Sequence, residues 1–206
     1  ATNSLGANKA LIVDTSVPTV TNVTSTTSDG SYRQGETIAI TVEFSEVVNV
    51  DESGGTPTLT LNNTSGTNPA VDYSSGSGST TLTFNYTIGS GETSGDLDYA
   101  TTSSLVLNSG TIKDAALNAA TLTLASPGAT NSLGANKALI VDTSVPTISS
   151  VSLNAANSQL TVTFAEDVYN TNGGSGDLEV ADFALSISGG AAGVNATPAS
   201  ITKSAQ

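Results

Sequence analysis

Apolar and polar residues alternate along most of the chain with the period of two that is typical of β-strands. Clusters of Gly, Ser and Asn, which favour turns, separate the alternating segments. The pattern predicts strands at Thr19–Thr24, Thr37–Phe44, Pro57–Leu61, Ala70–Tyr73, Thr80–Thr87, Leu97–Leu107 and Lys137–Val141. Short strands without a long helix predict an all-β fold, an antiparallel β-sandwich. The alanines of Thr111–Ala120 predict one helical turn between the last two strands.

One long segment occurs twice without substitution: ATNSLGANKALIVDTSVPT forms residues 1–19 and again residues 129–147. The spacing is that of a whole domain, well beyond the period of a solenoid, and indicates tandem duplication. We therefore expect three parts: 1–13 as the closing strand of a preceding repeat, 14–141 as a complete repeat, and 142–206 as the N-terminal part of a second, divergent repeat. Strands are expected in this last part at Ile148–Leu153, Gln159–Phe164 and Phe183–Ser188.

Composition narrows the possible functions. The chain has 18 acidic and 5 basic residues, a net charge of −13, which argues against nucleic acid as a partner because phosphates would be repelled. It has no Cys and no His, which removes disulfides, thiol catalysis, zinc–thiolate sites and the usual general base. No apolar run is long enough to predict membrane insertion.

The acidic residues gather at the two ends, or poles, of the expected sandwich. Loops of an antiparallel sandwich alternate between the poles. One pole is expected to collect Asp14, Glu46, Asp51, Glu52 and Asp114 with the amide of Asn118, and the other Asp29, Glu36, Glu92, Asp96, Asp98 and Asp142. Carboxylates that converge repel one another unless a cation joins them, and Ca²⁺ accepts six to eight oxygen ligands in tolerant geometry. The candidate Ca²⁺ ligands at the two poles and the linkers are Asp14, Glu46, Asp96, Asp98, Asp114, Asp142 and Glu166.

Two other interpretations of these acids stay open. Acidic residues in loops are commonly solvated and confer solubility without binding an ion. Asp114 and Asn118 also fit a capping pair for the helical turn expected in Thr111–Ala120.

The linker VDTSVPT, followed by ITVEFSE, TLTFNYT, SGDLDYA and GTIKDAALNAATL, resembles bacterial Ig-like or cadherin-like tandem repeats of large secreted surface adhesins. A weaker likeness continues through LTVTFAE and DLEVADFALSIS. The resemblance implies Greek-key Ig-like sandwiches in a tandem array, an extracellular location, Ca²⁺ at the junctions, and neighbouring repeats as partners. One residue departs from the pattern: Leu117 stands where a glycine would be expected.

These observations favour a structural spacer or stalk repeat that supports adhesion, and other functions fit less well. Two carboxylates could hydrolyse a glycoside, but the acids lie at the poles, and no enzyme activity is predicted. A carbohydrate-binding module would use exposed aromatic rings, and aromatic residues of any kind make up only 4% of the chain. Thr-x-Thr spacing would suit an ice-binding face, although threonine fills the solvent side of many strands.

The ends of the sequence raise a further alternative, homotypic strand exchange. The strand expected in residues 1–13 of one molecule could complement residues 142–206 of another and build a head-to-tail extracellular filament. The simpler interpretation is that both ends are boundaries within a longer chain.

Overall fold

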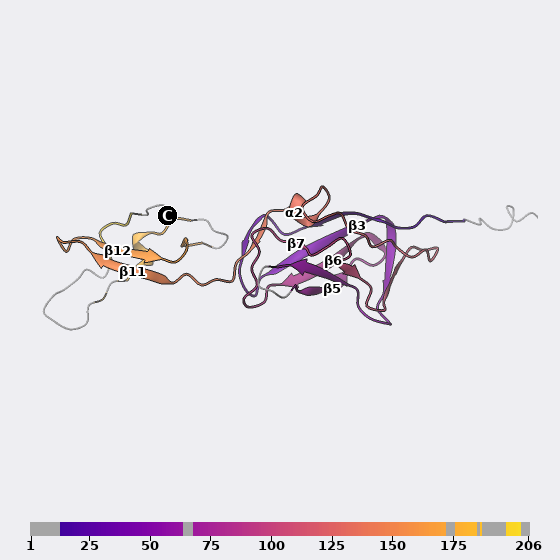
Figure 1. Ribbon diagram of the computed structural model, residues 1–206, viewed down its shortest axis with the longest axis horizontal. Helices are drawn as coiled ribbons and strands as arrows, with labels where there is room; N and C mark the ends of the chain where they lie inside the picture. The colour runs from indigo at the N-terminus through magenta and orange to yellow at the C-terminus, as the bar shows by residue number, and fades with distance from the viewer. Residues whose placement is uncertain (1–12, 64–67, 172–175, 185, 187–196, 203–206) are drawn as a thin grey trace, which may run out of the picture. The chain divides into compact units, whose positions relative to one another are not determined.

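The computed structural model describes residues 13–63, 68–171, 176–184, 186 and 197–202. Contacts divide the chain into two units, Ala1–Asp29 with Arg33–Thr143, and Gly30–Tyr32 with Ser144–Gln206. The expected closing strand at 1–13 lies outside the described residues except for Val13, which has no regular structure and is 87% exposed. Figure 1 shows the strands of the first repeat and the β11–β12 hairpin of the second unit.

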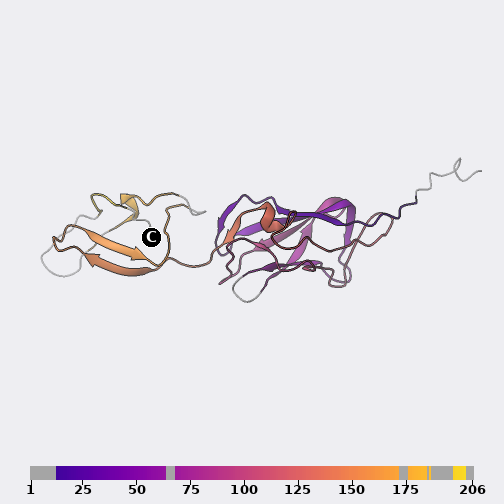
Figure 2. The same cartoon turned by 45° about the horizontal axis from the view of Figure 1, so that its top comes forward.

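The first repeat consists almost entirely of strands. In chain order, the elements up to Val141 are β1 (Val20–Ser25), β2 (Gly30–Tyr32), β3 (Thr37–Asp51), β4 (Thr58–Asn62), β5 (Ala70–Ser75), β6 (Ser79–Thr87), β7 (Asp98–Tyr99), β8 (Leu105–Val106), β9 (Thr111–Lys113), α2 (Leu133–Asn136) and β10 (Leu139–Val141). One sheet has the order β1-β3-β6-β5-β4-β7, with β8 paired to β4 and β9 paired to β3. Its pairings are antiparallel, and the sheet curls around the core (Figure 2). The predicted fold class is confirmed.

The core follows the alternation seen in the sequence. Buried residues of the two long central strands pair across the sheet: Ile38 with Tyr86, Ile40 with Phe84, and Val42 with Leu82. The ring of Tyr73 on β5 meets Phe84 edge-on, with 6.1 Å between the ring centroids. Burial of these apolar faces is the main favourable term for the sheet, because each large side chain contributes about 1.5–3 kcal/mol.

Two expectations about the later part of the repeat were wrong. The strand expected at Leu97–Leu107 is interrupted, because Thr101 N–H donates to Ser104 Oγ (2.8 Å) and closes a turn between β7 and β8. The helical turn expected in Thr111–Ala120 is absent, since β9 begins at Thr111 and pairs with the end of β3. Among the described residues of this repeat, a helix forms instead at α2, where Ser132 Oγ accepts the N–H of Ala135 at 3.2 Å as an N-cap.

The second unit begins as the first repeat does. Strands β11 (Ile148–Leu153) and β12 (Leu160–Phe164) lie where strands were expected, and they pair antiparallel. Ile148 pairs with Phe164 as Val20 pairs with Phe44, and both registers shift after this first pair. The two hairpins therefore share one register.

The strand expected at Phe183–Ser188 was wrong where it can be described. A 3₁₀ turn, η1 (Val180–Asp182), precedes it, and Phe183, Ala184 and Ser186 are not in a strand. The other residues of that segment lie outside the described part of the chain.

Candidate metal centre

Three carboxylates converge at the end of the first repeat where the linker leads into β1. Asp14 belongs to the linker, Glu46 to β3, and Asp114 to the loop after β9. One carboxylate oxygen from each lies within 4.8 Å of the other two. Asp14 is exposed, Glu46 is half-buried, and Asp114 is buried. We call these three residues the linker cluster.

A tight loop presents the Asp114 carboxylate. Its Oδ1 accepts the backbone N–H of Asn118 at 2.8 Å, and its Oδ2 accepts Asn118 Nδ2 at 2.7 Å. The same amide nitrogen also donates to the backbone oxygen of Asp14 at 3.3 Å. Burial favours the neutral acid, but the hydrogen bonds from Asn118 and from the N–H groups of Ala116 and Leu117 hold the pKa of Asp114 below its usual range. Asp114 and Asn118 therefore form a capped loop without a helix.

The residue that departs from the resemblance lies inside this loop. Leu117 has φ +73°, in the left-handed region that favours glycine, and its side chain is 74% exposed. Its N–H donates to the backbone oxygen of Asp114 at 3.3 Å. The loop thus keeps a conformation suited to glycine although leucine occupies the position.

Glu46 is the residue of the linker cluster whose ionised form is disfavoured. It lies in an irregular part of β3, where the register with β6 shifts between Glu43 and Val48. Burial raises the pKa of Glu46, and the negative charges of Asp14 and Asp114 raise it further. A cation at this point would reverse that shift, because positive charge favours the ionised acid.

The donor set suits a hard cation. It consists of carboxylate oxygens with an amide and a backbone carbonyl beside them, and it includes no nitrogen or sulfur ligand of the kind that selects zinc or copper. Among the described residues, the linker cluster is the group of three or more acids close enough to hold an ion.

The four other predicted ligands are not in such a group within the described part of the chain. Asp98 is buried and already bound, since its Oδ1 accepts Tyr99 N–H (2.8 Å) and its Oδ2 accepts Gly128 N–H (2.9 Å). Burial and then the charge of Asp98 raise the pKa of the exposed Asp96, while the N–H of Leu139 lowers it. These contacts give Asp98 a role in fixing its own loop.

Asp142 and Glu166 repeat part of the linker cluster in the sequence. Asp142 occupies the same place in the second copy of the linker as Asp14 does in the first. Glu166 follows Phe164 as Glu46 follows Phe44, and both phenylalanines hold the same register position. Their part in a junction site stays a prediction.

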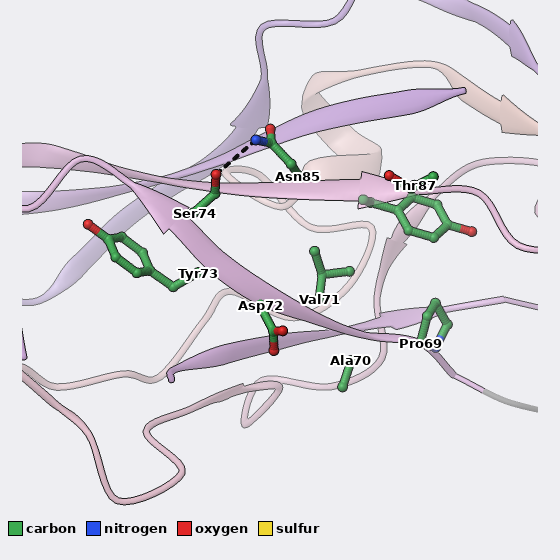
Figure 3. A pocket seen from close by; sticks show the side chains of 9 residues that line it. Pro69, Ala70, Val71, Asp72, Tyr73, Ser74, Asn85 and Thr87 are labelled. Atoms are coloured by element: carbon green, nitrogen blue, oxygen red, sulfur yellow. Dashed lines mark hydrogen bonds between the residues drawn. The ribbon is translucent and has the colours of Figure 1, made fainter. Parts of the chain in front are cut away.

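A hollow of about 360 Å³ lies over β5 and β6 (Figure 3). Asn85 Nδ2 donates to Ser74 Oγ at 2.9 Å within it, so this amide is already engaged. Tyr86 is 2% exposed, and its hydroxyl donates to Glu92 at 2.7 Å. The hydroxyl of Tyr73 accepts Ser77 N–H at 2.8 Å. The hollow therefore offers little of the aromatic surface on which a sugar stacks.

Comparison with known proteins agrees with this architecture. No curated protein and no solved structure matches the chain. Among the described residues no helix is long and apolar enough to cross a membrane. The family profile of the bacterial Ig-like domain matches residues 14–126, more than half of the chain. Such domains are typically non-catalytic and are commonly extracellular or at the cell surface. The chain belongs to the bacterial Ig-like domain family.

Proposed function

We propose that this chain is a structural spacer from the stalk of an extracellular bacterial adhesin, a non-catalytic part in which Ca²⁺ stiffens the linkers between repeats. The observation that carries the proposal is the linker cluster. It joins a residue of the linker, Asp14, to two residues of the folded repeat, Glu46 and Asp114.

Among its described residues, the linker is held to the repeat at Asp14, whose backbone oxygen accepts Asn118 Nδ2 at 3.3 Å, and again from Pro18 onward. There, Thr121 N–H donates to Pro18 O (2.8 Å) and Thr19 N–H donates to Ser45 Oγ (3.0 Å). Residues 13–17 have no regular structure and are exposed. Ca²⁺ bound by Asp14, Glu46 and Asp114 would extend the fixed part of the chain by several residues and set its direction.

The binding energy would also stabilise the repeat. A ligand that binds only the folded state raises the free energy of unfolding by about 2.7 kcal/mol at a concentration one hundred times its Kd. The stabilisation would be greatest where the acids repel one another when no cation is present. Asp142 and Glu166 extend the same proposal to the next linker because they are the sequence counterparts of Asp14 and Glu46.

Calorimetry and small-angle X-ray scattering with Ca²⁺ and with a chelator test the proposal. We expect Ca²⁺ to raise the melting temperature and to lengthen the particle. The variant Asp114→Asn should lose both responses, whereas Asp72→Asn, on β5 and outside the linker cluster, should keep them. If Ca²⁺ changes neither melting nor length in the unmodified chain, the Ca²⁺ part of the proposal is wrong.

A further inference from the structure

Three exposed apolar side chains lie beside the linker cluster. Val17 is 46% exposed, Val47 is 48% exposed and Leu117 is 74% exposed. Val17 belongs to the linker, Val47 directly follows Glu46, and Leu117 lies in the loop 114–118. We call Val17, Val47 and Leu117 the apolar collar. The other exposed large apolar residues among the described residues of this repeat are Val13, Val106 and Ile140.

Hydrogen bonds bring the two valines of the apolar collar together. Ser45 N–H donates to Thr19 O at 2.9 Å, and Thr19 N–H donates to Ser45 Oγ at 3.0 Å. Val17 lies two residues before Thr19, and Val47 lies two residues after Ser45. Because β1 and β3 run antiparallel, both valines follow the same end of this pairing.

Leu117 occupies an unfavourable backbone conformation. Its φ of +73° disfavours any residue with a Cβ atom. Most of its side chain is exposed, so packing inside the repeat offsets little of this cost. Unfavourable backbone conformations of this kind cluster where a residue has a function beyond the fold. Leu117 therefore points to a contact outside the repeat.

The chain that arrives at the linker identifies what makes this contact. Val13 is the sequence copy of Val141, the last residue of β10, so the duplication predicts a repeat that ends at Val13. The next residue, Asp14, is already bonded to the loop of Leu117, since its backbone oxygen accepts Asn118 Nδ2 at 3.3 Å. Consecutive Cα atoms are about 3.8 Å apart, so a repeat that ends at Val13 ends beside this loop.

The end of a repeat also carries an apolar side chain. Ile140 precedes Val141 in β10 and is 40% exposed. The duplicated sequence places an isoleucine directly before Val13 as well. An incoming repeat would therefore bring an exposed isoleucine to the apolar collar.

The second unit differs at this point. Glu166 is the counterpart of Glu46, so Asp167 stands in the place of Val47. An ionised side chain opposes apolar packing. The apolar collar is therefore a feature of the entrance to the first repeat, and it is not a general consequence of the repeat sequence.

We propose that the apolar collar is covered by the preceding repeat of the same chain, whose end packs on Val17, Val47 and Leu117. A short tether gives the preceding repeat an effective concentration on the order of 1 mM, so a small apolar patch is sufficient for association. Burial of these side chains would hold the junction by packing in addition to any bound cation. Such packing requires the tandem arrangement of the proposed function, and it does not require its Ca²⁺.

Thiol labelling of a tandem chain tests this packing, because the protein has no cysteine of its own. The tandem consists of the full chain with an added copy of residues 14–128 before Ala1. Since residues 1–13 repeat residues 129–141, the addition forms a second complete copy of the first repeat, joined through the native linker. The variant Val47→Cys is made only in the original repeat. Its thiol should react with iodoacetamide about tenfold more slowly in the tandem than in the original chain, as for a contact formed about nine-tenths of the time.

Two variants control the labelling. Val106→Cys places the thiol on β8 at a side chain of similar exposure, 44%, and it should react at the same rate in both chains. Leu117→Asn keeps a residue that tolerates the left-handed conformation but removes the apolar side chain. Combined with Val47→Cys in the tandem, it should restore the fast reaction of the original chain.

The labelling is measured with Ca²⁺ and with a chelator. Slow reaction at position 47 in either condition supports the packing, and equally fast reaction of both chains in both conditions refutes it. The proposal is also wrong if slow reaction survives Leu117→Asn, or if it depends on protein concentration, which would place a second molecule on the apolar collar. Melting and scattering report the cation, so slow labelling without any Ca²⁺ response would overturn only the Ca²⁺ part of the proposed function.

Discussion

Replacing Leu117 with glycine should stabilise the first repeat. A left-handed conformation costs a side-chain-bearing residue about 1–2 kcal/mol relative to glycine. Leu117 holds φ +73°, and because its side chain is 74% exposed, truncation removes little buried surface. The glycine variant gives back about 0.5–1 kcal/mol of this gain, because glycine raises the conformational entropy of the unfolded chain. The balance favours Leu117→Gly by about 0.5–1 kcal/mol, a rise in melting temperature of about 2–4 °C for a domain of this size.

Thermal unfolding followed by far-ultraviolet circular dichroism, with chelator present, measures this effect apart from any bound cation. The matched control is Ala116→Gly, because Ala116 is exposed in the same loop and has no positive φ. This control should lower the free energy of unfolding by about 0.5–1 kcal/mol, since only the entropic cost remains. The reasoning about left-handed strain is wrong if Leu117→Gly destabilises the repeat as much as Ala116→Gly does.

Two further substitutions test the core and the linker cluster. Leu139→Ala removes a fully buried side chain of β10 and should lower the free energy of unfolding, measured with denaturant, by about 2–5 kcal/mol. Ile140→Ala changes the half-exposed neighbour and should lower it by less than about 1 kcal/mol. Glu46→Gln should raise the melting temperature at pH 7 in chelator, because the raised pKa of Glu46 means that its ionised form destabilises the folded repeat. That gain should shrink as the pH falls through the pKa of Glu46 in the folded repeat. It should vanish below the pKa of the same residue in the unfolded chain. The control Glu52→Gln replaces an exposed glutamate outside the linker cluster and should not raise the melting temperature. An equal rise for both variants would contradict the view that the linker cluster destabilises ionised Glu46.

The strands of the central sheet were predictable because period-two alternation records burial directly. Thr37–Phe44 and Thr80–Thr87 pair in register and fill the core, as their sequence indicated. The helical turn expected in Thr111–Ala120 failed because β9 pairs with the end of β3. Two other misses share a cause, which is local side-chain hydrogen bonding. Ser104 closes a turn within the apolar segment Leu97–Leu107, and Ser132 caps a helix too short to show a period. Neither event changes the alternation of apolar residues.

The linker cluster was predictable for a different reason. Loop parity places five acids at one pole of an antiparallel sandwich: Asp14, Glu46, Asp51, Glu52 and Asp114. The structure brings Asp14, Glu46 and Asp114 within reach of one another, and Glu46 lies within β3 and not in the loop that follows it. Parity does not say which carboxylates of a pole come within reach of one another. Asp98 accepts N–H groups from Tyr99 and Gly128, bonds that depend on exact loop geometry. The contacts of Asn136 with Asn22 and of Lys137 with Asp29 were not predicted, because they join residues far apart in the chain.

The two ends of the repeat are therefore held by different forces. Where the linker arrives, like charges on Asp14, Glu46 and Asp114 oppose a fixed geometry, and the proposed Ca²⁺ would relieve that repulsion. Where the chain leaves, Leu139 and Val141 are buried and backbone bonds hold them, and Asp98 is already satisfied by N–H groups. Chelation should loosen the first attachment and leave the second intact. On the proposed function, loss of the cation would let the chain bend at the linker while β10 keeps the sandwich closed.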